Sequence, residues 1–361
     1  MRVILFLFGL VLIAGCAPRQ TAQVAEPVAK AEVLPIWVAT QRALDNSGPA
    51  FGVRRTGVMS YMRADVSIPP THQPGRIEWP GPYEEANAEE HFALVGSEVL
   101  PDVNALRKAL PHKGSERETV VFVHGYNVTL SDAMYRMAQM AHDFQTPNPS
   151  VLFSWQSAGD ARGYVYDRDS VLYARDDLET FLNQMTRTSN DSVMLVAHSM
   201  GSQLVMETLR QMSLKGNRQT LSRINAVILM SPDLDTDLFR RQAGAIGDLP
   251  QPFVVFVSSK DRILGLSSIL TGRKQRLGVL QDPSEVAGLD VSILDFSALN
   301  SDAQTSHDVA STSPAAISVV KGMTAQARQG GAAFDNYMVL TEQPQQRGGI
   351  LPGGGGLLPG F

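Results

Sequence analysis

The chain contains a single cysteine, Cys16, among its 361 residues. One thiol per chain cannot form an intramolecular disulfide, even in a compartment that would allow one. The net charge of −5 lacks the basic excess that marks a nucleic-acid-binding protein. No cluster of Cys or His has metal-ligand spacing, and the sequence has no P-loop and no G-x-G-x-x-G after a strand. We therefore expect no nucleic-acid partner, no metal and no cofactor.

An unbroken apolar run, Val3 to Ile13, stands near the N-terminus, and no other apolar run approaches transmembrane length. It is too short to span a bilayer as a mature helix, so we interpret residues 1–15 as a signal peptide. The run ends in Ile13-Ala14-Gly15-Cys16, which resembles a bacterial lipobox, where the cysteine is lipidated and becomes the new N-terminus. The alternative is a plain signal peptide with an incidental cysteine.

Lipidation of Cys16 would make the protein a lipoprotein of the cell envelope. Several acyl chains on one cysteine anchor a protein stably, whereas a single chain holds only marginally. Ala17 follows the cysteine, at a place where aspartate would signal retention in the inner membrane. We therefore expect an outer-membrane protein that faces the periplasm and contacts the membrane through Cys16.

The two ends of the chain differ in composition from its middle. Residues 16–33 are small and polar and predict a flexible tether, and the Gly- and Pro-rich residues 343–361 predict a disordered tail. Residues 34–330 alternate apolar strands with helices, which predicts one α/β domain with a mostly parallel sheet covered on both faces. Strands are predicted at 119–123, 151–155, 192–196, 226–230, 253–257 and 291–295, antiparallel edge strands at 52–61 and 92–95, and helices at 131–144, 175–185 and 201–212.

The motif Ala197-His198-Ser199-Met200-Gly201 directly follows one of these strands and directly precedes a helix. It is the G-x-S-x-G nucleophile elbow with alanine in the first position, and the flanking residues must be small because larger ones would collide with the neighbouring strand and helix. This turn predicts Ser199 as the nucleophile and the Met200 N–H as an oxyanion-hole donor. His198 should point away from the serine. The alternative is a strand-to-helix turn whose serine is incidental.

The loop His124-Gly125-Tyr126-Asn127 follows the strand 119–123 and is expected to supply the second oxyanion-hole donor. Gly125 permits a close approach, and the donor is the backbone N–H of either Tyr126 or Asn127. We expect His124 to brace the loop rather than to act as a base.

In folds that carry a nucleophile elbow, the catalytic triad runs serine, acid, histidine along the chain. Of the seven histidines only His307 follows Ser199, so we predict it as the base. Asp233 and Asp261 follow neighbouring strands at their carboxyl ends, where an open α/β sheet builds its site. We prefer Asp261 as the acid because it follows the penultimate strand, which is the commoner arrangement. Asp233 is the alternative acid, or else a helix cap or a brace of the site.

Two further segments carry expectations. The segment Ala158 to Tyr173 contains Tyr164, Tyr166 and Tyr173, and it either walls an acyl pocket or packs against the edge of the domain. The basic Arg273-Lys274-Gln275-Arg276 is expected to be a solvated surface turn.

In these motifs the chain resembles a bacterial α/β-hydrolase family of unassigned function in the esterase/lipase superfamily. The resemblance covers nearly everything between the two ends, and it implies the α/β-hydrolase fold and a Ser–Asp–His site while leaving the substrate open. The chain departs from the family pattern at Met62, where glycine is usual, and at Asp308-Val309, where aromatics are usual. The matching motifs, in order, are Ala39–Arg42, Val66–His72 with Gly75 and Glu78–Pro80, Phe122–Val128, Tyr164–Ser170, Ala197–Gly201 with Glu207, Pro232–Asp235, and Ser259–Asp261 with Arg276–Gly278.

Together these residues predict a serine hydrolase that cleaves a carboxylic ester, either a small molecule or a lipid, through an acyl-enzyme. Lipase, phospholipase or amidase specificity on the same site is an alternative. A catalytically silent envelope-binding protein on a hydrolase scaffold is the alternative from another class.

Overall fold

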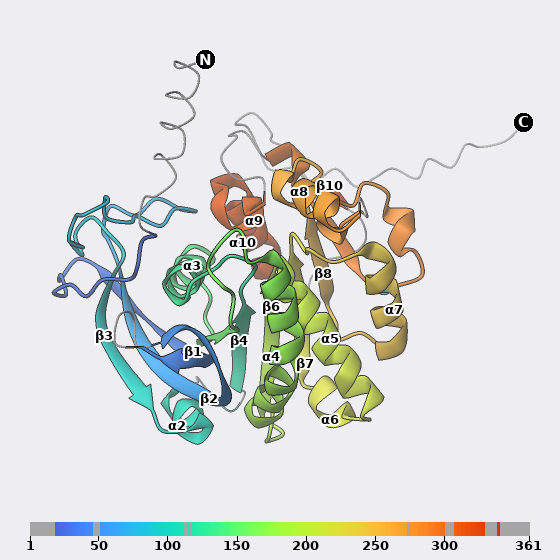
Figure 1. Ribbon diagram of the computed structural model, residues 1–361, viewed down its shortest axis with the longest axis horizontal. Helices are drawn as coiled ribbons and strands as arrows, with labels where there is room; N and C mark the ends of the chain where they lie inside the picture. The colour runs from blue at the N-terminus through green and yellow to red at the C-terminus, as the bar shows by residue number, and fades with distance from the viewer. Residues whose placement is uncertain are drawn as a thin grey trace, which may run out of the picture.

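The computed structural model describes residues 19–45, 51–111, 115, 117–272, 275–299, 307–328 and 338–339. Within them one sheet of ten strands runs in the order β10-β9-β8-β7-β6-β4-β5-β1-β2-β3 (Figure 1). The predicted signal peptide, Cys16 and the predicted tail at 343–361 lie outside the described residues.

The parallel part of the sheet confirms the predicted α/β class. Each ladder between neighbouring strands from β5 to β10 is parallel. All six predicted strands of this part are present. The strands are β4 (Arg117–Val123), β5 (Ser150–Ser154), β6 (Asp191–His198), β7 (Ile224–Met230), β8 (Phe253–Val257), β9 (Ser292–Asp295) and the short β10 (Met338–Val339).

Three N-terminal strands, β1 (Glu32–Leu44), β2 (Phe51–Ile68) and β3 (Ala93–Leu100), extend the sheet on the β5 side. β2 and β3 correspond to the two predicted antiparallel strands and both run further than expected, but β2 lies between β1 and β3 rather than at the edge of the sheet. β1 joins them to the rest by pairing in parallel with β5. It has no counterpart among the predicted strands, because the buried polar residues Gln41 and Arg42 interrupt its apolar pattern.

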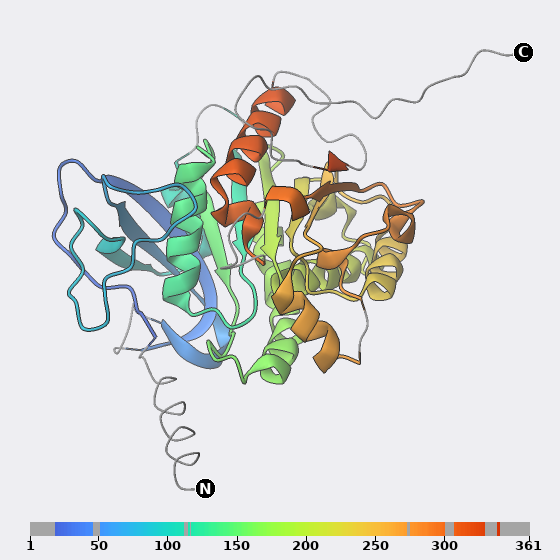
Figure 2. The same cartoon turned by 90° about the horizontal axis from the view of Figure 1, so that it is seen from above.

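Helices cover both faces of the sheet, as Figures 1 and 2 show. The alternation of β4 explains why: Val121 and Val123 belong to one core, and Val120 and Phe122 belong to the other. The first core includes residues of α4 (Tyr164–Met185), α5 (Met200–Leu214) and α7 (Thr236–Ile246), and the second includes residues of α3 (Leu130–Asp143), α9 (Val309–Thr312) and α10 (Pro314–Arg328). The shorter helices are α2 (Val103–Ala109), α6 (Arg218–Leu221) and α8 (Arg262–Leu270).

Helix α4 begins at Tyr164, eleven residues before the predicted start at 175. Asp167 and Ser170 are fully buried in its first turns. Because these polar residues occupy the buried face, the first turns lack the apolar period that predicts a helix. The segment Ala158 to Tyr173 is therefore mostly helix.

The first described part of the expected tether at 16–33 lies against the domain. The Ala22 N–H donates to Ser131 Oγ at 2.9 Å, and Val24 forms a bridge with Leu94 of β3. Backbone pairing and side-chain contacts thus hold residues 19–25, where a flexible tether was expected. No helix among the described residues has the length and apolar character needed to cross a membrane.

Candidate active site

Ser199 occupies the turn between β6 and α5. Its backbone has φ 52° and ψ −122°, a positive φ that residues other than glycine seldom adopt and that the nucleophile elbow requires. The Ser199 N–H donates to the carbonyl of Met230 on the neighbouring β7 at 2.9 Å, which fixes the turn to the sheet. Helix α5 begins at Met200, so Ser199 lies at the N-terminus of that helix. The helix dipole favours negative charge there.

Two glycines allow the elbow to meet its neighbours. A Cβ atom at Gly201 would lie 2.4 Å from the carbonyl oxygen of His124 and 2.5 Å from that of Val123. A Cβ atom at Gly125 would lie 2.9 Å from the Cβ of Ser199. The loop after β4 therefore runs directly against the serine, which is where an oxyanion-hole loop must lie.

His307 is held by Asp261. Its Nδ1 lies 2.6 Å from Asp261 Oδ2, and both side chains are buried. The other carboxylate oxygen of Asp261 accepts the Leu264 N–H at 2.9 Å, so this residue also caps α8 and is fixed in place. Burial by itself lowers the pKa of His307, but the hydrogen bond and the negative charge of Asp261 outweigh it, and the net pKa is raised.

The segment that carries His307 contacts the elbow at His198. The rings of His198 and His307 lie 4.8 Å apart, and His198 Nε2 lies 3.0 Å from Asp308 Oδ1. His198, the residue before Ser199, thus faces the His307 loop rather than the serine. Among the described residues no hydrogen bond joins the Ser199 hydroxyl to His307. Such bonds often tighten only when substrate is bound.

Asp233, the alternative acid, has other partners. It accepts hydrogen bonds from Ser267 Oγ at 2.6 Å and Tyr164 Oη at 3.0 Å, and Arg276 Nε lies 3.2 Å from its carboxylate. The expectation of a solvated turn is wrong for Arg276, which is only 4% exposed. Its guanidinium is buried because Asp233 supplies the opposite charge. In this structure Asp233 therefore contacts α8 and Arg276, whereas Asp261 contacts His307.

The loop after β4 carries the two candidate oxyanion-hole donors, Tyr126 and Asn127. The Asn127 N–H donates to Asp167 Oδ2 at 3.1 Å and is therefore occupied. Of the two, Tyr126 remains the candidate to act with Met200, which lies in the first turn of α5, where backbone N–H groups have no partner within the helix. The positive φ of Asn127 (58°) turns the chain at this point.

Two charged residues for which the sequence predicted no role bind this loop, Asp167 at Asn127 and Arg42 at Val128. Asp167 accepts from Ser157 Oγ at 2.6 Å and from the Ala158 N–H at 2.7 Å, in addition to the bond from Asn127. Arg42 is fully buried and donates to Ser154 Oγ at 3.0 Å and the Val128 carbonyl at 3.1 Å. Burial lowers the pKa of Arg42 to about 10, and the charge of Asp167 opposes that shift. A charged residue inside an apolar strand was the available signal for Arg42.

His124 is a brace, as expected. It is 1% exposed, its ring stacks on Trp155 with centroids 5.0 Å apart, and Trp155 Nε1 donates to the His124 carbonyl at 2.7 Å. Burial lowers its pKa to about 3, and the positive charge of Arg42 adds to the effect. The ring is therefore neutral at physiological pH and is held away from proton transfer.

Arg19 binds the same loop from outside. Its guanidinium donates to Asn127 Oδ1 at 2.7 Å and to Asp132 Oδ2 at 2.7 Å, and it also contacts the carbonyls of Asn127 and Gly159. These bonds bring the N-terminal segment to the rim of the candidate site.

The tyrosines of the segment 158–173 divide between the two expected roles. The Tyr164 ring packs edge-on against Tyr126 of the oxyanion-hole loop, with centroids 5.3 Å apart. Tyr166 and Tyr173 instead flank the guanidinium of Arg55 on β2, at 4.1 and 5.4 Å from the ring centroids. Only Tyr164 therefore lies beside the site, and the other two pack against the edge of the domain.

A family model described as alpha/beta hydrolase of unknown function (DUF900) matches residues 103–324, a stretch that contains Ser199, Asp261 and His307. No curated protein matches the chain. Similar solved structures include a dienelactone hydrolase from Anabaena variabilis ATCC 29413, 13% identical, covering 78% of this chain and 95% of that one with a TM-score of 0.38. An esterase from Pyrobaculum calidifontis is 12% identical over 84% and 87% (TM-score 0.34), and lipase B from Aspergillus fumigatus is 14% identical over 62% and 57% (TM-score 0.39).

Similarities this distant carry no argument about activity. The family match stands on its own, because it spans more than half of the chain and includes the elbow, the loop after β4 and both aspartates. The chain belongs to the α/β-hydrolase family of unknown function, DUF900.

Proposed function

We propose that the protein is a serine hydrolase that cleaves carboxylic esters. The observation that carries this proposal is the buried Asp261–His307 pair, in which His307 Nδ1 lies 2.6 Å from Asp261 Oδ2. The His307 ring packs against the ring of His198, the residue that precedes Ser199 in the chain. A serine hydroxyl becomes a nucleophile when an adjacent base takes its proton and a third group orients that base. Ser199, His307 and Asp261 supply these three groups.

The steps follow from the hydrogen bonds. Asp261 accepts the Nδ1–H of His307, which leaves Nε2 free to take the Ser199 proton. The serine oxygen attacks the ester carbonyl, and the oxyanion accepts hydrogen bonds from the N–H groups of Tyr126 and Met200, each worth about 3–4 kcal/mol in the transition state. Collapse expels the alcohol, which takes the proton from His307. Water then repeats the cycle on the acyl-enzyme and releases the acid.

Labelling by a fluorophosphonate probe tests the nucleophile. Wild type should be labelled stoichiometrically and Ser199→Ala should not be labelled, while Ser202→Ala, which removes a buried hydroxyl one turn into α5, should label normally. An unlabelled, folded wild type would support the silent envelope-binding protein instead.

A substrate panel separates the ester hydrolase from its rivals. We expect soluble short-chain aryl esters to be cleaved faster than emulsified long-chain lipids and amides, because Tyr126 and Tyr164 place aromatic rings with polar ends beside the site. Faster cleavage of phospholipid or of anilide substrates would assign the phospholipase or amidase specificity.

We also propose that the enzyme is anchored through a lipid on Cys16. Arg19, which binds the oxyanion-hole loop, lies three residues after this cysteine. Three extended residues span at most about 10 Å. An anchor at Cys16 would therefore hold the catalytic face close to the membrane surface.

A further inference from the structure

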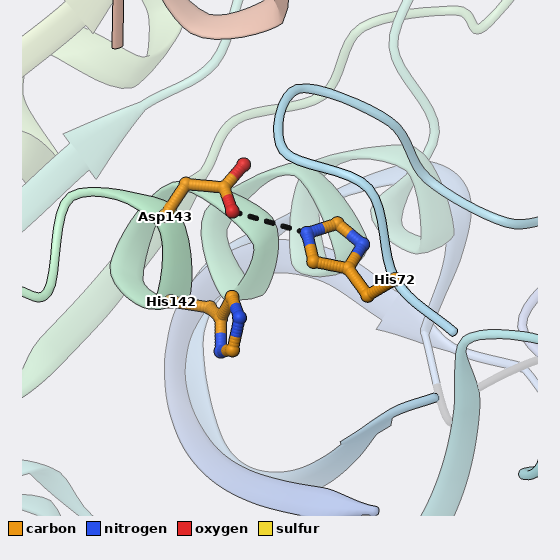
Figure 3. Close-up of side chains that lie close together, drawn as sticks. All are labelled: His72, His142 and Asp143. Carbon is orange, nitrogen blue, oxygen red and sulfur yellow. Dashed lines mark hydrogen bonds and ion pairs between the residues drawn. The ribbon is translucent and has the colours of Figure 1, made fainter. Parts of the chain in front are cut away.

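A second cluster of titratable side chains takes no part in the proposed mechanism. His72 lies in the loop between β2 and β3, and His142 and Asp143 are at the C-terminal end of α3 (Figure 3). One ligand atom from each of the three residues lies within 4.8 Å of the others. In the figure a dashed line joins the Asp143 carboxylate to the His72 ring, and the His142 ring lies below them in the view.

His72 is oriented at both ring nitrogens. Its Nδ1 lies 2.8 Å from Glu78 Oε2, and its Nε2 lies 3.0 Å from Asp143 Oδ1. The side chain is 5% exposed. A carboxylate on one nitrogen of a histidine is the usual outer contact of a metal ligand, because it fixes the tautomer and directs the other nitrogen to the ion.

The carboxylate of Asp143 has one oxygen committed and one directed at His72. Oδ2 accepts the Gly75 N–H at 2.7 Å and the side-chain amide of Gln139 at 2.5 Å. Oδ1 faces His72 Nε2. The side chain is 1% exposed, so this oxygen has a fixed position.

His142 is the most exposed residue of the three. Its side chain is 33% exposed, and its Nδ1 lies 3.0 Å from Oε2 of Glu32, at the start of β1. A hollow on the surface is lined by these two residues together with Asp143 and Lys321 of α10. The end of α3 thus presents an imidazole that can rotate towards its buried neighbours.

We propose that His72, His142 and Asp143 bind a zinc ion that joins the loop after β2 to α3. Zinc takes histidine and carboxylate ligands at about 2.0–2.2 Å, so tetrahedral ligand atoms stand about 3.3 Å apart. The pair His72 Nε2 and Asp143 Oδ1 is already close to that separation, and rotation of His142 brings in the third ligand. Glu32 or water fills the fourth position.

The three ligands lie on two separate segments, the loop after β2 and the end of α3. The ligands come from segments far apart in sequence, which is why spacing along the chain gave no sign of a metal.

The test is a zinc titration of the full chain in detergent, after chelator treatment and dialysis. Wild type should bind one zinc per chain by calorimetry at pH 7. His142→Ala should weaken binding at least tenfold, since losing even an outer contact of a ligand costs about 10–100-fold. His91→Gln, which removes a histidine outside the cluster, should bind as wild type does.

His72 and Asp143 variants can lose stability because these side chains are buried, so His142→Ala is the deciding variant. Cobalt provides a second measurement: intense visible bands of a tetrahedral site should appear in wild type and be absent in His142→Ala. A wild type without a saturable site, or a His142→Ala variant with unchanged affinity and spectrum, would overturn the proposal. His72 would then be an ion-paired brace only.

Discussion

Replacing Asp261 by asparagine isolates what the acid does for His307. Asparagine keeps the size of the side chain and is as good a helix N-cap as aspartate, so the bond to the Leu264 N–H at the start of α8 should survive. What is lost is the negative charge 2.6 Å from His307 Nδ1. An amide can also present its N–H₂ to the ring and thereby hold the wrong tautomer.

The structure sets the size of the effect. Both partners are buried, so water cannot replace the missing carboxylate. The corresponding substitution in a serine protease costs about 10⁴-fold in turnover, and we expect a loss of that order, or about 5.5 kcal/mol of transition-state stabilisation. Because the hydrogen bond and the charge of Asp261 are the largest causes that raise the pKa of His307, the rising limb of the pH profile should move to lower pH in Asp261→Asn.

The matched control is Asp233→Asn. That change leaves Arg276 buried without its opposite charge, so it should destabilise the fold, by about 3–5 kcal/mol for a broken buried pair. It should leave kcat of the folded fraction within about tenfold and shift the pH profile less than Asp261→Asn does, because Asp233 contributes less than Asp261 to raising the pKa of His307. The assay is kcat/KM on a soluble aryl ester from pH 5 to 9, beside thermal unfolding of each variant. A larger loss of turnover in Asp233→Asn than in Asp261→Asn would refute the reasoning.

Four further outcomes follow from the same structure. Ser199→Ala and His307→Ala should each abolish esterase activity, with losses near 10⁶-fold, and the double variant should be little worse; a His307→Ala rate within about tenfold of wild type would exclude it as the base. In wild type, kcat/KM should rise with pH through a midpoint above 6.5, because His307 must be neutral to act and its pKa is raised. Cys16→Ser should release the protein from the membrane fraction, and unchanged fractionation with an unmodified Cys16 by mass spectrometry would contradict lipidation. In metal-free protein, the raised pKa of His72 makes its protonated ring stabilise the fold. This stabilisation should be complete below the unfolded pKa near 6.5 and should disappear as pH rises through the folded pKa of about 9. His72→Gln should therefore flatten that part of the melting-temperature profile.

The sequence predicted the parallel sheet well because its strands are buried on both faces. Such strands read as continuous apolar runs, and β8, with the sequence Phe-Val-Val-Phe-Val, was placed at its observed bounds. β1 and the first turns of α4 were missed for one shared reason. Each carries buried polar side chains, Arg42 and Asp167 among them, that pair with partners far away in the sequence.

In the candidate site, too, local motifs could be predicted from the sequence and contacts between distant residues could not. Ser199 could be found because the elbow is a local motif, in which a strand, a turn and a helix are contiguous. The sequence favoured Asp261 over Asp233 only by its place after the penultimate strand, since both aspartates follow neighbouring strands at the same edge of the sheet. Their roles depend on Arg276, which lies against Asp233, and on His307, which lies against Asp261. Those contacts are set by tertiary packing.

Buried charged residues hold two segments of the candidate site. Arg42 and Asp167 bind the loop after β4 that carries the Tyr126 N–H, and Arg276 and Asp233 bind each other beside α8. Buried charges add little net stability, because desolvation offsets their attraction. Their value here is positional: hydrogen bonds from a buried charge are directional and lose energy when a loop shifts, whereas apolar contacts tolerate small displacements. An oxyanion donor acts only when it is already in place as charge develops on the substrate, so a rigid loop lowers the barrier without further reorganisation.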